Sequence, residues 1–496
     1  MFRNVVLFFL MIAANCFYSN AQQVILSNEN IDDPGYEHVK VIGEEENGFY
    51  LLQSNISLQT QRDRIGFKNR KYKISYYNYA LQLKWTKKLE EENDQNNIDI
   101  VTMFRNHPLV ITSQVQKNDN TITFFGQLLN ADGNTFIPSK KVGTVKYDKG
   151  SDLEKPRFVV SHNESNAAII LEEDRDNDQV LHTLIIDSAM NLKAQQSPVI
   201  SYPAKQLEVT DIVFADENEL AAIGQSEEKN QDGQKGKTKK YKLFLLRKGE
   251  SSFVESTISS GKKNITEAAL SIDSYNKKVV VAGFYNDNDS YTGTGIIFAS
   301  QALTNHSEIE IKTVIIDDNA RVKMIGERNS GSNTGLFGYP IRKLILRSDG
   351  GAVVVAEAAY YSEYSYYDYF TQSFTRRTEY HYDNVIILSI HSNGTIDWSG
   401  VLRKSQETMD DGGFLSSFCS VLQSDRIEMV YNNEIGRNNE VHLYTINNKG
   451  ISDQKVLTRS GQHIVIIPHS GKQVDENTLI AVAIQKKKLV LVKFEL

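Results

Sequence analysis

The chain carries its apolar residues in short uninterrupted runs rather than at helical spacing. Runs such as Val279–Phe284 and Val385–Ile390 are rich in β-branched side chains and are bounded by Asn, Asp and Gly. Runs of about four to eight such residues are typical of β-strands. Because these runs are continuously apolar, both faces of each strand must be covered by protein. The pattern therefore predicts an all-β chain whose hairpins pack between other sheets.

A unit of about four short strands and polar turns recurs along the chain, which favours a β-propeller over a stack of sandwiches. The predicted units run over 36–92, 98–147, 155–202, 207–260, 264–318, 340–406, 412–460 and 462–496. We therefore predict a closed β-propeller of eight four-stranded antiparallel blades, with seven blades as the alternative count.

Two internal matches support the repeat. The segments Leu83–Leu89 and Ile396–Leu402 place the chain's two tryptophans at the same point of the unit. Turn dipeptides fall at comparable points of several units, at Asp132-Gly133, Asp349-Gly350, Asn393-Gly394 and Lys449-Gly450. The last unit has room for only three strands, and Val24–Ser27 is predicted to supply the fourth. Residues 22–496 then form a single domain whose two ends join in a shared last blade.

The first residues are typical of a secretory signal peptide. Arg3 is followed by the apolar segment Val5–Ala14, which is too short to span a bilayer. Small residues at Ser19 and Ala21 predict cleavage after Ala21, so that residues 1–21 are removed. We expect a periplasmic protein with no transmembrane segment in the mature chain. The alternatives are an extracellular protein or one anchored by lipid through Cys16.

The net charge and the cysteine content bear on the class of partner and on disulfide bonding. Lys and Arg number 55 against 62 Asp and Glu, a net charge of -7, so no nucleic-acid partner is expected. After signal removal Cys419 has no partner for an intrachain disulfide. It lies in a strand-like apolar run, which predicts a small buried hydrophobic side chain rather than a reactive thiol.

The sequence carries none of the short catalytic motifs. H-E-x-x-H and G-x-S-x-G are absent, and no two histidines have zinc-ligand spacing on one element. The acidic run Glu172–Asp178 lacks the glycine and glutamate of a calcium loop, because Gln179 and Ile185 stand at those positions. We predict no cofactor, no metal and no catalytic residues. The enzyme question stays open, leaning towards no, because a channel site assembled from several blades leaves no local motif.

Three long insertions interrupt the repeat. Ser226–Lys240 is polar and glycine-containing, and we interpret it as a solvated hairpin tip. Asp317–Tyr339 contains four glycines, and we interpret it as a flexible loop over one end of the ring, with no helix after it. Tyr360–Asp383 holds eight of the 24 tyrosines and is predicted to project as an over-long hairpin. Tyr and Arg are enriched in binding hot spots. The candidate partner-binding residues are Tyr360, Tyr361, Tyr364, Tyr366, Tyr367, Tyr369, Phe370, Phe374, Arg376, Arg377, Tyr380 and Tyr382. The alternative is that these rings cover the neighbouring blade.

The segment Gly351–Val430 resembles exported β-propeller proteins of Bacteroidota-type Gram-negative envelopes. The resemblance rests on the aromatic hairpin, then Asp383–Ile387, Asn393–Trp398 and Asp410–Phe414. It implies a non-catalytic subunit of an outer-membrane assembly, of which the type IX secretion translocon is one, and it supplies no functional residue.

These observations lead to three functional hypotheses. The first is a non-catalytic protein-binding propeller that acts as a scaffold or accessory subunit of an envelope complex, with a protein partner. The second is a carbohydrate-active hydrolase with its site in the channel. Two carboxylates converging with an Arg or His at the channel mouth would favour this second hypothesis. The third is a glycan-binding module that uses the tyrosines without turnover.

Overall fold

The fold is described from a computed structural model. It describes residues 23–56, 70–89, 97–202, 206–229, 237–258, 263–286, 292–325, 335–370, 372–436 and 439–496. The predicted signal peptide, its cleavage after Ala21 and the alternative anchor Cys16 lie outside the described residues. Within them, no helix is both long and apolar enough to cross a membrane.

The chain is built almost wholly from β-strands. In the first half these are β1 Gln23–Leu26, β2 His38–Glu45, β3 Gly48–Ser54, β4 Tyr72–Asn78, β5 Leu83–Leu89, β6 Asn97–Phe104, β7 His107–Gln116, β8 Thr121–Leu129, β9 Thr135–Lys146, β10 Asp152–Leu153, β11 Arg157–Val160, β12 Asn166–Asp174, β13 Gln179–Asp187, β14 Leu192–Gln196, β15 Val199–Ile200, β16 Leu207–Phe214, β17 Leu220–Lys229 and β18 Lys237–Leu246. The second half adds β19 Val254–Ile258, β20 Asn264–Asp273, β21 Lys278–Asn286, β22 Gly295–Ala302, β23 Glu310–Ile315, helix α2 Asp318–Ile325, β24 Ile341–Leu346, β25 Ala352–Asp368, β26 Ser373–Ile390, β27 Ile396–Leu402, β28 Gln406–Met409, β29 Phe418–Leu422, β30 Arg426–Glu434, β31 Glu440–Asn447, β32 Ser452–Thr458, the 3-10 turn η2 Ser460–Gln462, β33 Ile464–Asp475, β34 Thr478–Gln485 and β35 Lys488–Glu495.

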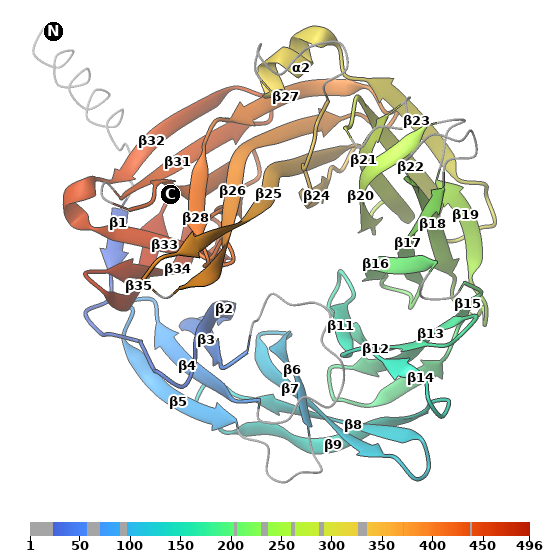
Figure 1. Ribbon diagram of the computed structural model, residues 1–496. Helices are drawn as coiled ribbons and strands as arrows, with labels where there is room; N and C mark the ends of the chain where they lie inside the picture. Colours follow the sequence, from blue (N-terminus) through green and yellow to red (C-terminus); the bar gives the residue numbers. More distant parts are fainter. Residues whose placement is uncertain are drawn as a thin grey trace, which may run out of the picture.

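Among the described residues the strands form eight antiparallel sheets, arranged around a central opening (Figure 1). Seven of the sheets run outward in chain order, for example β2-β3-β4-β5 and β16-β17-β18-β19. Innermost strands of neighbouring sheets pack on one another, as β20 does on β24 and β29 on β33. This radial arrangement of four-stranded meanders is a β-propeller. The predicted fold class is confirmed, and the count is eight rather than seven.

The eighth sheet takes strands from both ends of the chain. Its order is β1-β35-β34-β33, so the N-terminal strand is the outermost one. Val24 pairs with Phe494 and Leu26 with Val492. The prediction that Val24–Ser27 completes the last unit is therefore confirmed. That residues 22–496 fold as one closed unit remains a prediction.

The core lies between the sheets rather than at the centre of the molecule. In β25, Val354 and Ala356 face sheet five, where they pack in one cluster with Val280 and Phe298. Their neighbour Val355 faces the opposite side and packs with Met429 and other residues of sheet seven. Side chains alternate across a strand, so a strand covered on both faces needs apolar residues at every position. This explains the uninterrupted apolar runs in the sequence.

The innermost strands share a local irregularity. A β-bulge interrupts the pairing of β2, β6, β16, β20 and β24 with the second strand of their sheet. The residues that the register skips at these bulges are Ile42, Asp99, Thr210, Thr266 and Arg342. Bulges re-aim side chains and often lie beside functional sites. In β33 a longer interruption between Ile467 and Lys472 contains His469.

The long insertions leave the molecule at one end. In an antiparallel meander, the turn between the second and third strands and the connection to the next sheet lie at the same end. The long hairpin β25–β26, the strand β28 and the segment that contains α2 are all connections of this kind. The expectation of a loop over Asp317–Tyr339 was wrong at the start of this segment, because Asp318–Ile325 form the helix α2. Asp317 caps α2, because its Oδ1 accepts from the Ala320 backbone N–H at 2.8 Å.

Candidate functional site

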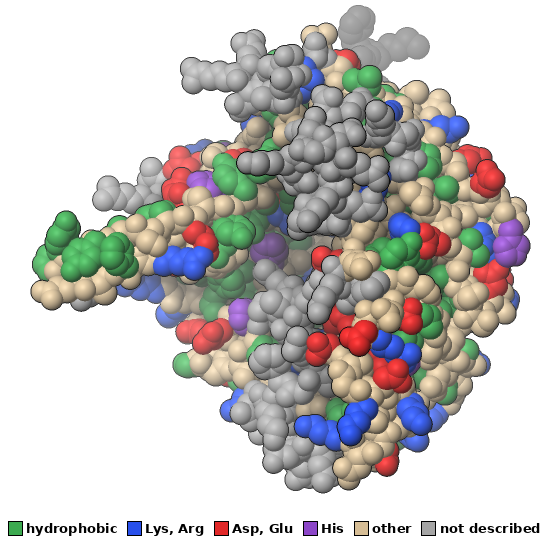
Figure 2. Space-filling model, turned by 45° about the vertical axis from the view of Figure 1, so that its right-hand side comes forward, with side chains coloured by type: hydrophobic (Ala, Val, Ile, Leu, Met, Phe, Trp, Pro, Cys, Tyr) green, Lys and Arg blue, Asp and Glu red, His purple; other side chains and the backbone are tan. Residues whose placement is uncertain are grey.

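The predicted aromatic hairpin is an arm that projects from the ring, formed by β25 and β26 (Figures 1 and 2). Its rings do not cover a neighbouring blade. Tyr360, Tyr361, Tyr364, Tyr366, Tyr367, Tyr369, Phe370 and Phe374 all have exposed fractions between 41% and 101%. Tyr367 packs edge-on against Tyr369 and Phe374 at the tip. The arm therefore presents its aromatic side chains to solvent.

The remaining predicted residues of the arm have partners in the arm or in the segments beside it. Arg376 pairs with Glu363, and Arg377 pairs with Asp410. Tyr380 lies across the ladder from Tyr361 and is half-buried. Tyr382, at the base of the arm, has the Arg342 guanidinium over its ring at 5.7 Å. The structure thus separates an exposed aromatic tip from a polar base, and the base leads to the channel.

A buried ionic network fixes the base of the arm. The Glu357 and Lys404 side chains are fully buried, and Lys404 Nζ lies 2.9 Å from Glu357 Oε1. Arg342 Nε donates to Glu357 Oε2 at 2.9 Å, and Ser417 Oγ donates to the same oxygen at 2.7 Å. Lys404 also donates to the Tyr382 carbonyl at 2.9 Å. Each charge has an opposite charge and further hydrogen bonds, as buried ions require. The network holds Arg342 in a fixed orientation with 30% of its side chain exposed.

The positive charge of Arg342 acts on two titratable groups of other sheets, Glu267 and His469. The pKa of Glu267 in β20 is raised because burial disfavours its charged form, against the opposing effect of Lys239 and Arg342. Burial lowers the pKa of His469, and the positive charge of Arg342 lowers it further. His469 also lies within electrostatic range of Glu357 and Lys40. Arg342, near the start of β24, is thus hydrogen-bonded to Glu357 and lies within electrostatic range of Glu267 and His469. Two carboxylates, an arginine and a histidine are the groups that the hypothesis of a channel enzyme calls for.

A cleft of about 230 Å³ opens beside this cluster. Glu267, Lys239 and Tyr339 line it, together with Phe337, whose side chain is mostly exposed. Burial raises the pKa of Tyr339 to about 12, so its hydroxyl stays protonated at neutral pH. Figure 2 shows a hollow beside the base of the arm. Clefts that contain ionisable groups with perturbed pKa values are candidate active sites.

Further basic side chains lie on the inner strands. Burial lowers the pKa of Lys40, with a smaller contribution from Lys472. Burial also lowers the pKa of Lys343, which follows Arg342 in β24. No three metal-ligating side chains gather anywhere in the described part of the chain. The arrangement is equipped for proton transfer and for holding an anionic group.

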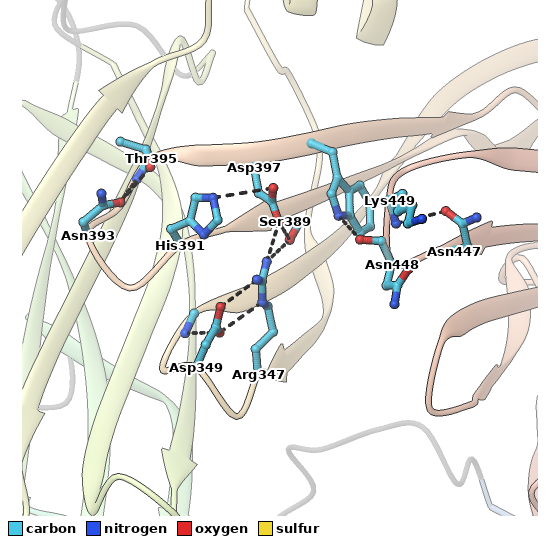
Figure 3. A network of polar contacts seen from close by, with 12 residues as sticks. Arg347, Asp349, Ser389, His391, Asn393, Thr395, Asp397, Asn447, Asn448 and Lys449 are labelled. Carbon is cyan, nitrogen blue, oxygen red and sulfur yellow. Dashed lines mark hydrogen bonds and ion pairs between the residues drawn. The ribbon is translucent and has the colours of Figure 1, made fainter.

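A larger pocket, of about 640 Å³, lies between sheets six and seven at the opposite end of the molecule. Figure 3 shows the polar contacts beside it. Arg347 binds both oxygens of Asp349, at 3.1 and 2.6 Å, and Asp397 Oδ2 at 2.8 Å. His391 Nε2 lies 3.5 Å from the other oxygen of Asp397. These charges compensate one another, and Arg347 lowers the pKa of Asp397. The Asp349 and Asp397 carboxylates are therefore held in their charged form.

Neither ionisable cluster gave a signal in the sequence. Glu267, Arg342 and His469 come from three different sheets and are far apart in the chain. Their convergence depends on the bulges, which shift the side-chain alternation and have no residue signature of their own. The predicted arm residues, by contrast, were visible as a local excess of tyrosine.

Comparison with known proteins adds little to the site. No protein-family model matches the chain. No curated protein matches it either. Among solved structures, the β-propeller domain of the Trilobed protease from Pyrococcus furiosus aligns at 8% identity and TM-score 0.36, over 85% of this chain and 98% of that one. The polysaccharide lyase Uly1 aligns at 10% identity and TM-score 0.38, over 96% of this chain and 93% of that one. A variant of the Synechocystis apocarotenoid oxygenase aligns at 6% identity and TM-score 0.37, over 96% of this chain and 93% of that one.

The expectation of a non-catalytic scaffold is contradicted by this comparison. Solved structures that align over nearly the whole chain include enzymes, an oxygenase and a lyase. The expectation rested on the absence of local catalytic motifs, and such motifs are not needed when a site is assembled from several sheets. At these identities and TM-scores the similarity transfers no reaction, substrate or residue to this chain.

Proposed function

We propose that this protein is a carbohydrate-active enzyme that cleaves its substrate by acid–base catalysis at the arm end of the channel. The observation that carries the proposal is that Arg342 lies within electrostatic range of both Glu267 and His469, which belong to two other sheets, and that Glu267 lines a cleft. The proposal keeps the second sequence hypothesis and replaces the first.

The three side chains have complementary roles. Glu267 has a raised pKa, so it retains a proton more readily than an ordinary glutamate and is suited to protonate a leaving oxygen. The pKa of His469 is lowered, so its imidazole is neutral at pH 7 and can accept a proton. Environments that push two pKa values apart are the usual sign of an acid and a base. Arg342, anchored by Glu357, is positioned to bind an anionic group.

The surroundings favour an acidic sugar chain as substrate. Lys239 acts on Glu267 together with Arg342, and Lys40 acts on His469 together with Arg342, so positive charge gathers here although the whole chain carries a net charge of -7. The arm that rises from Tyr382 offers exposed aromatic rings alternating with hydroxyl and charged groups. Flat rings stack on the apolar faces of sugars, and the polar groups between them can bond hydroxyls.

The test is turnover of a panel of neutral and uronic-acid-containing polysaccharides, followed by the release of reducing ends. Glu267→Gln and His469→Asn should each lower kcat by roughly 100-fold or more. Arg342→Gln should raise KM mainly for the acidic substrates. Glu310→Gln is the matched control, because Glu310 is a solvent-exposed residue in the outermost strand of the same sheet as Glu267. No turnover of any substrate, or full activity of Glu267→Gln, would refute the proposal.

An exported location is part of the proposal. It is supported by the sequence pattern of residues 1–21 and fits an enzyme that meets polysaccharides in the periplasm or outside the cell. N-terminal sequencing of the native protein should give a first residue of Gln22. A lipid-modified Cys16 would instead support the anchored alternative.

A further inference from the structure

Three side chains of sheet three are hydrogen-bonded in line, far from the arm in the chain. Ser197 Oγ lies 2.9 Å from His182 Nδ1. The other ring nitrogen, His182 Nε2, lies 2.8 Å from Glu173 Oε2. This order of hydroxyl, imidazole and carboxylate is the one in which a serine nucleophile is paired with its base.

The pairing of three adjacent strands creates this alignment. His182 in β13 stands opposite Leu171 in β12, and Glu173 lies two residues further along the same face. The outer strand is interrupted next to them, because β14 ends at Gln196 and β15 begins at Val199. Ser197 falls in this interruption, beside the Pro198 carbonyl that accepts from the Leu181 N–H. Ser197 is exposed, whereas His182 is 4% exposed.

Glu173 is held firmly in its ionised form. Its side chain is fully buried and accepts from the Asp148 backbone N–H at 2.7 Å, from Ser151 Oγ at 2.8 Å and from Arg175 Nη2 at 2.9 Å. Burial alone would raise the pKa of Glu173, but these donors together with His182 lower it to about 2. The carboxylate is therefore charged at every physiological pH.

The charge on Glu173 fixes the tautomer of His182. An ionised carboxylate has no hydrogen to donate, so the hydrogen between it and the imidazole belongs to Nε2. In the neutral ring Nδ1 then carries a lone pair, and the hydrogen of its bond to Ser197 comes from the serine hydroxyl. His182 is thus oriented to remove the proton of Ser197.

We propose that Ser197 is the nucleophile of a second active site, which transfers and hydrolyses small acyl esters. Ser197 Oγ attacks the ester carbonyl carbon while its proton passes to His182 Nδ1. The imidazole returns that proton to the departing alcohol as the carbonyl–oxygen bond breaks. Water then repeats the cycle on the acyl-serine and releases the acid. Val199, about two-fifths exposed and two residues beyond Ser197, provides apolar surface for the acyl group. This proposal is independent of the site at Glu267.

The test uses a fluorophosphonate probe on the full mature protein, with peptide mapping of the modified residue. Wild type should be labelled at Ser197, and Ser197→Ala should lose that label without a change in melting temperature. His182→Gln should slow labelling roughly 100-fold, the usual contribution of a general base. Ser201→Ala is the matched control, because Ser201 is an exposed serine close in sequence with no histidine partner among the hydrogen bonds of the described residues. It should be labelled at the wild-type rate.

Two further readouts separate catalysis from a purely structural role. Hydrolysis of p-nitrophenyl acetate should disappear in Ser197→Ala, although Ser197 is exposed and its loss should not unfold the protein. The same hydrolysis should slow roughly 100-fold in His182→Gln. Absence of a label at Ser197 in the folded wild type would overturn the proposal. So would equal labelling of wild type and His182→Gln.

Discussion

Trp85 and Trp398 make the same contact in two different sheets. Trp398 Nε1 donates to the Asn448 carbonyl of the next sheet at 3.0 Å, and Trp85 Nε1 donates to the Ala131 carbonyl of its own next sheet. Two residues beyond each carbonyl stands a glycine with positive φ, Gly450 and Gly133. A Cβ on either glycine would come within 2.9 Å of the indole side chain. Each tryptophan therefore locks one blade to the following one.

Trp398→Ala should weaken the packing between its own sheet and the next one. Removing a fully buried tryptophan costs roughly 3–5 kcal/mol, and Trp398 is half-buried, so we expect a loss of about 2 kcal/mol in the free energy of unfolding. Tyr275→Ala is the control, since Tyr275 is 81% exposed and should change stability by less than about 0.5 kcal/mol. Urea denaturation measures both variants. An unchanged midpoint for Trp398→Ala would show that the contact contributes nothing.

Deleting Leu489–Leu496 should unfold the whole domain. The deletion removes most of β35, which pairs with β34 on one side and β1 on the other. Val490, Leu491, Val492 and Phe494 are buried there. A thermal melt of the truncated chain should show no cooperative transition at the temperature of the mature protein. A truncated chain that melts like the full one would refute both the single domain and the role of the shared sheet.

Replacing Tyr366, Tyr367, Tyr369 and Phe370 by serine should leave the melting temperature nearly unchanged. These rings are exposed, and exposed substitutions usually alter stability by less than about 0.5 kcal/mol each. If the arm guides a sugar chain to the cleft, KM for the polysaccharide should increase while kcat is preserved. A large loss of stability would show that the arm packs against the ring in solution. An unchanged KM would exclude the arm from substrate binding.

Glu173 should make the protein acid-sensitive. The folded pKa of about 2 lies below the ordinary value of 4.5, so the carboxylate contributes stability above pH 4.5 and loses it as the pH falls towards 2. This difference in pKa between the folded and unfolded states corresponds to about 3 kcal/mol in the free energy of unfolding. Glu173→Gln should lack this part of the pH dependence. Chemical denaturation at several pH values between 2 and 6 compares the two proteins, and parallel curves would contradict the assignment.

Cys419 should resist thiol reagents in the folded protein. Burial raises the pKa of its thiol to about 12, and only 4% of the residue is exposed. At pH 8 a chromogenic disulfide reagent should react only after denaturant is added. Rapid modification of the native chain would show that the strand β29 opens readily.

Much of the fold followed from local sequence. The apolar runs, the turn dipeptides and the two tryptophans were enough to place the eight units within a few residues of the observed sheets, because each blade forms from residues close in the chain. All four predicted glycine turns have positive φ at the glycine, namely Gly133, Gly350, Gly394 and Gly450. The burial of Cys419 was also predicted correctly from its apolar neighbours.

The ionisable sites were not predictable in this way. Glu173 belongs to an acidic run that we interpreted only as a failed calcium loop, yet the register between β12 and β13 buries it beside His182. Arg342 and His469 lie at irregular points of their strands and come within electrostatic range of each other although they belong to different sheets. Register and bulges are set by packing across many residues, so no short motif records them.

The shared sheet has a consequence for the order of events during synthesis. The strand β1 is made long before its hydrogen-bonding partner β35, because the two lie at opposite ends of the described residues. Each of the other seven sheets can assemble as soon as its own segment is available. The eighth must wait until β35 has been made, and until then β1 and the inner strand β2 lack neighbours on that side. A chaperone or export factor that holds the N-terminal segment extended would therefore act on the blade whose outer strand waits longest for its hydrogen-bonding partner.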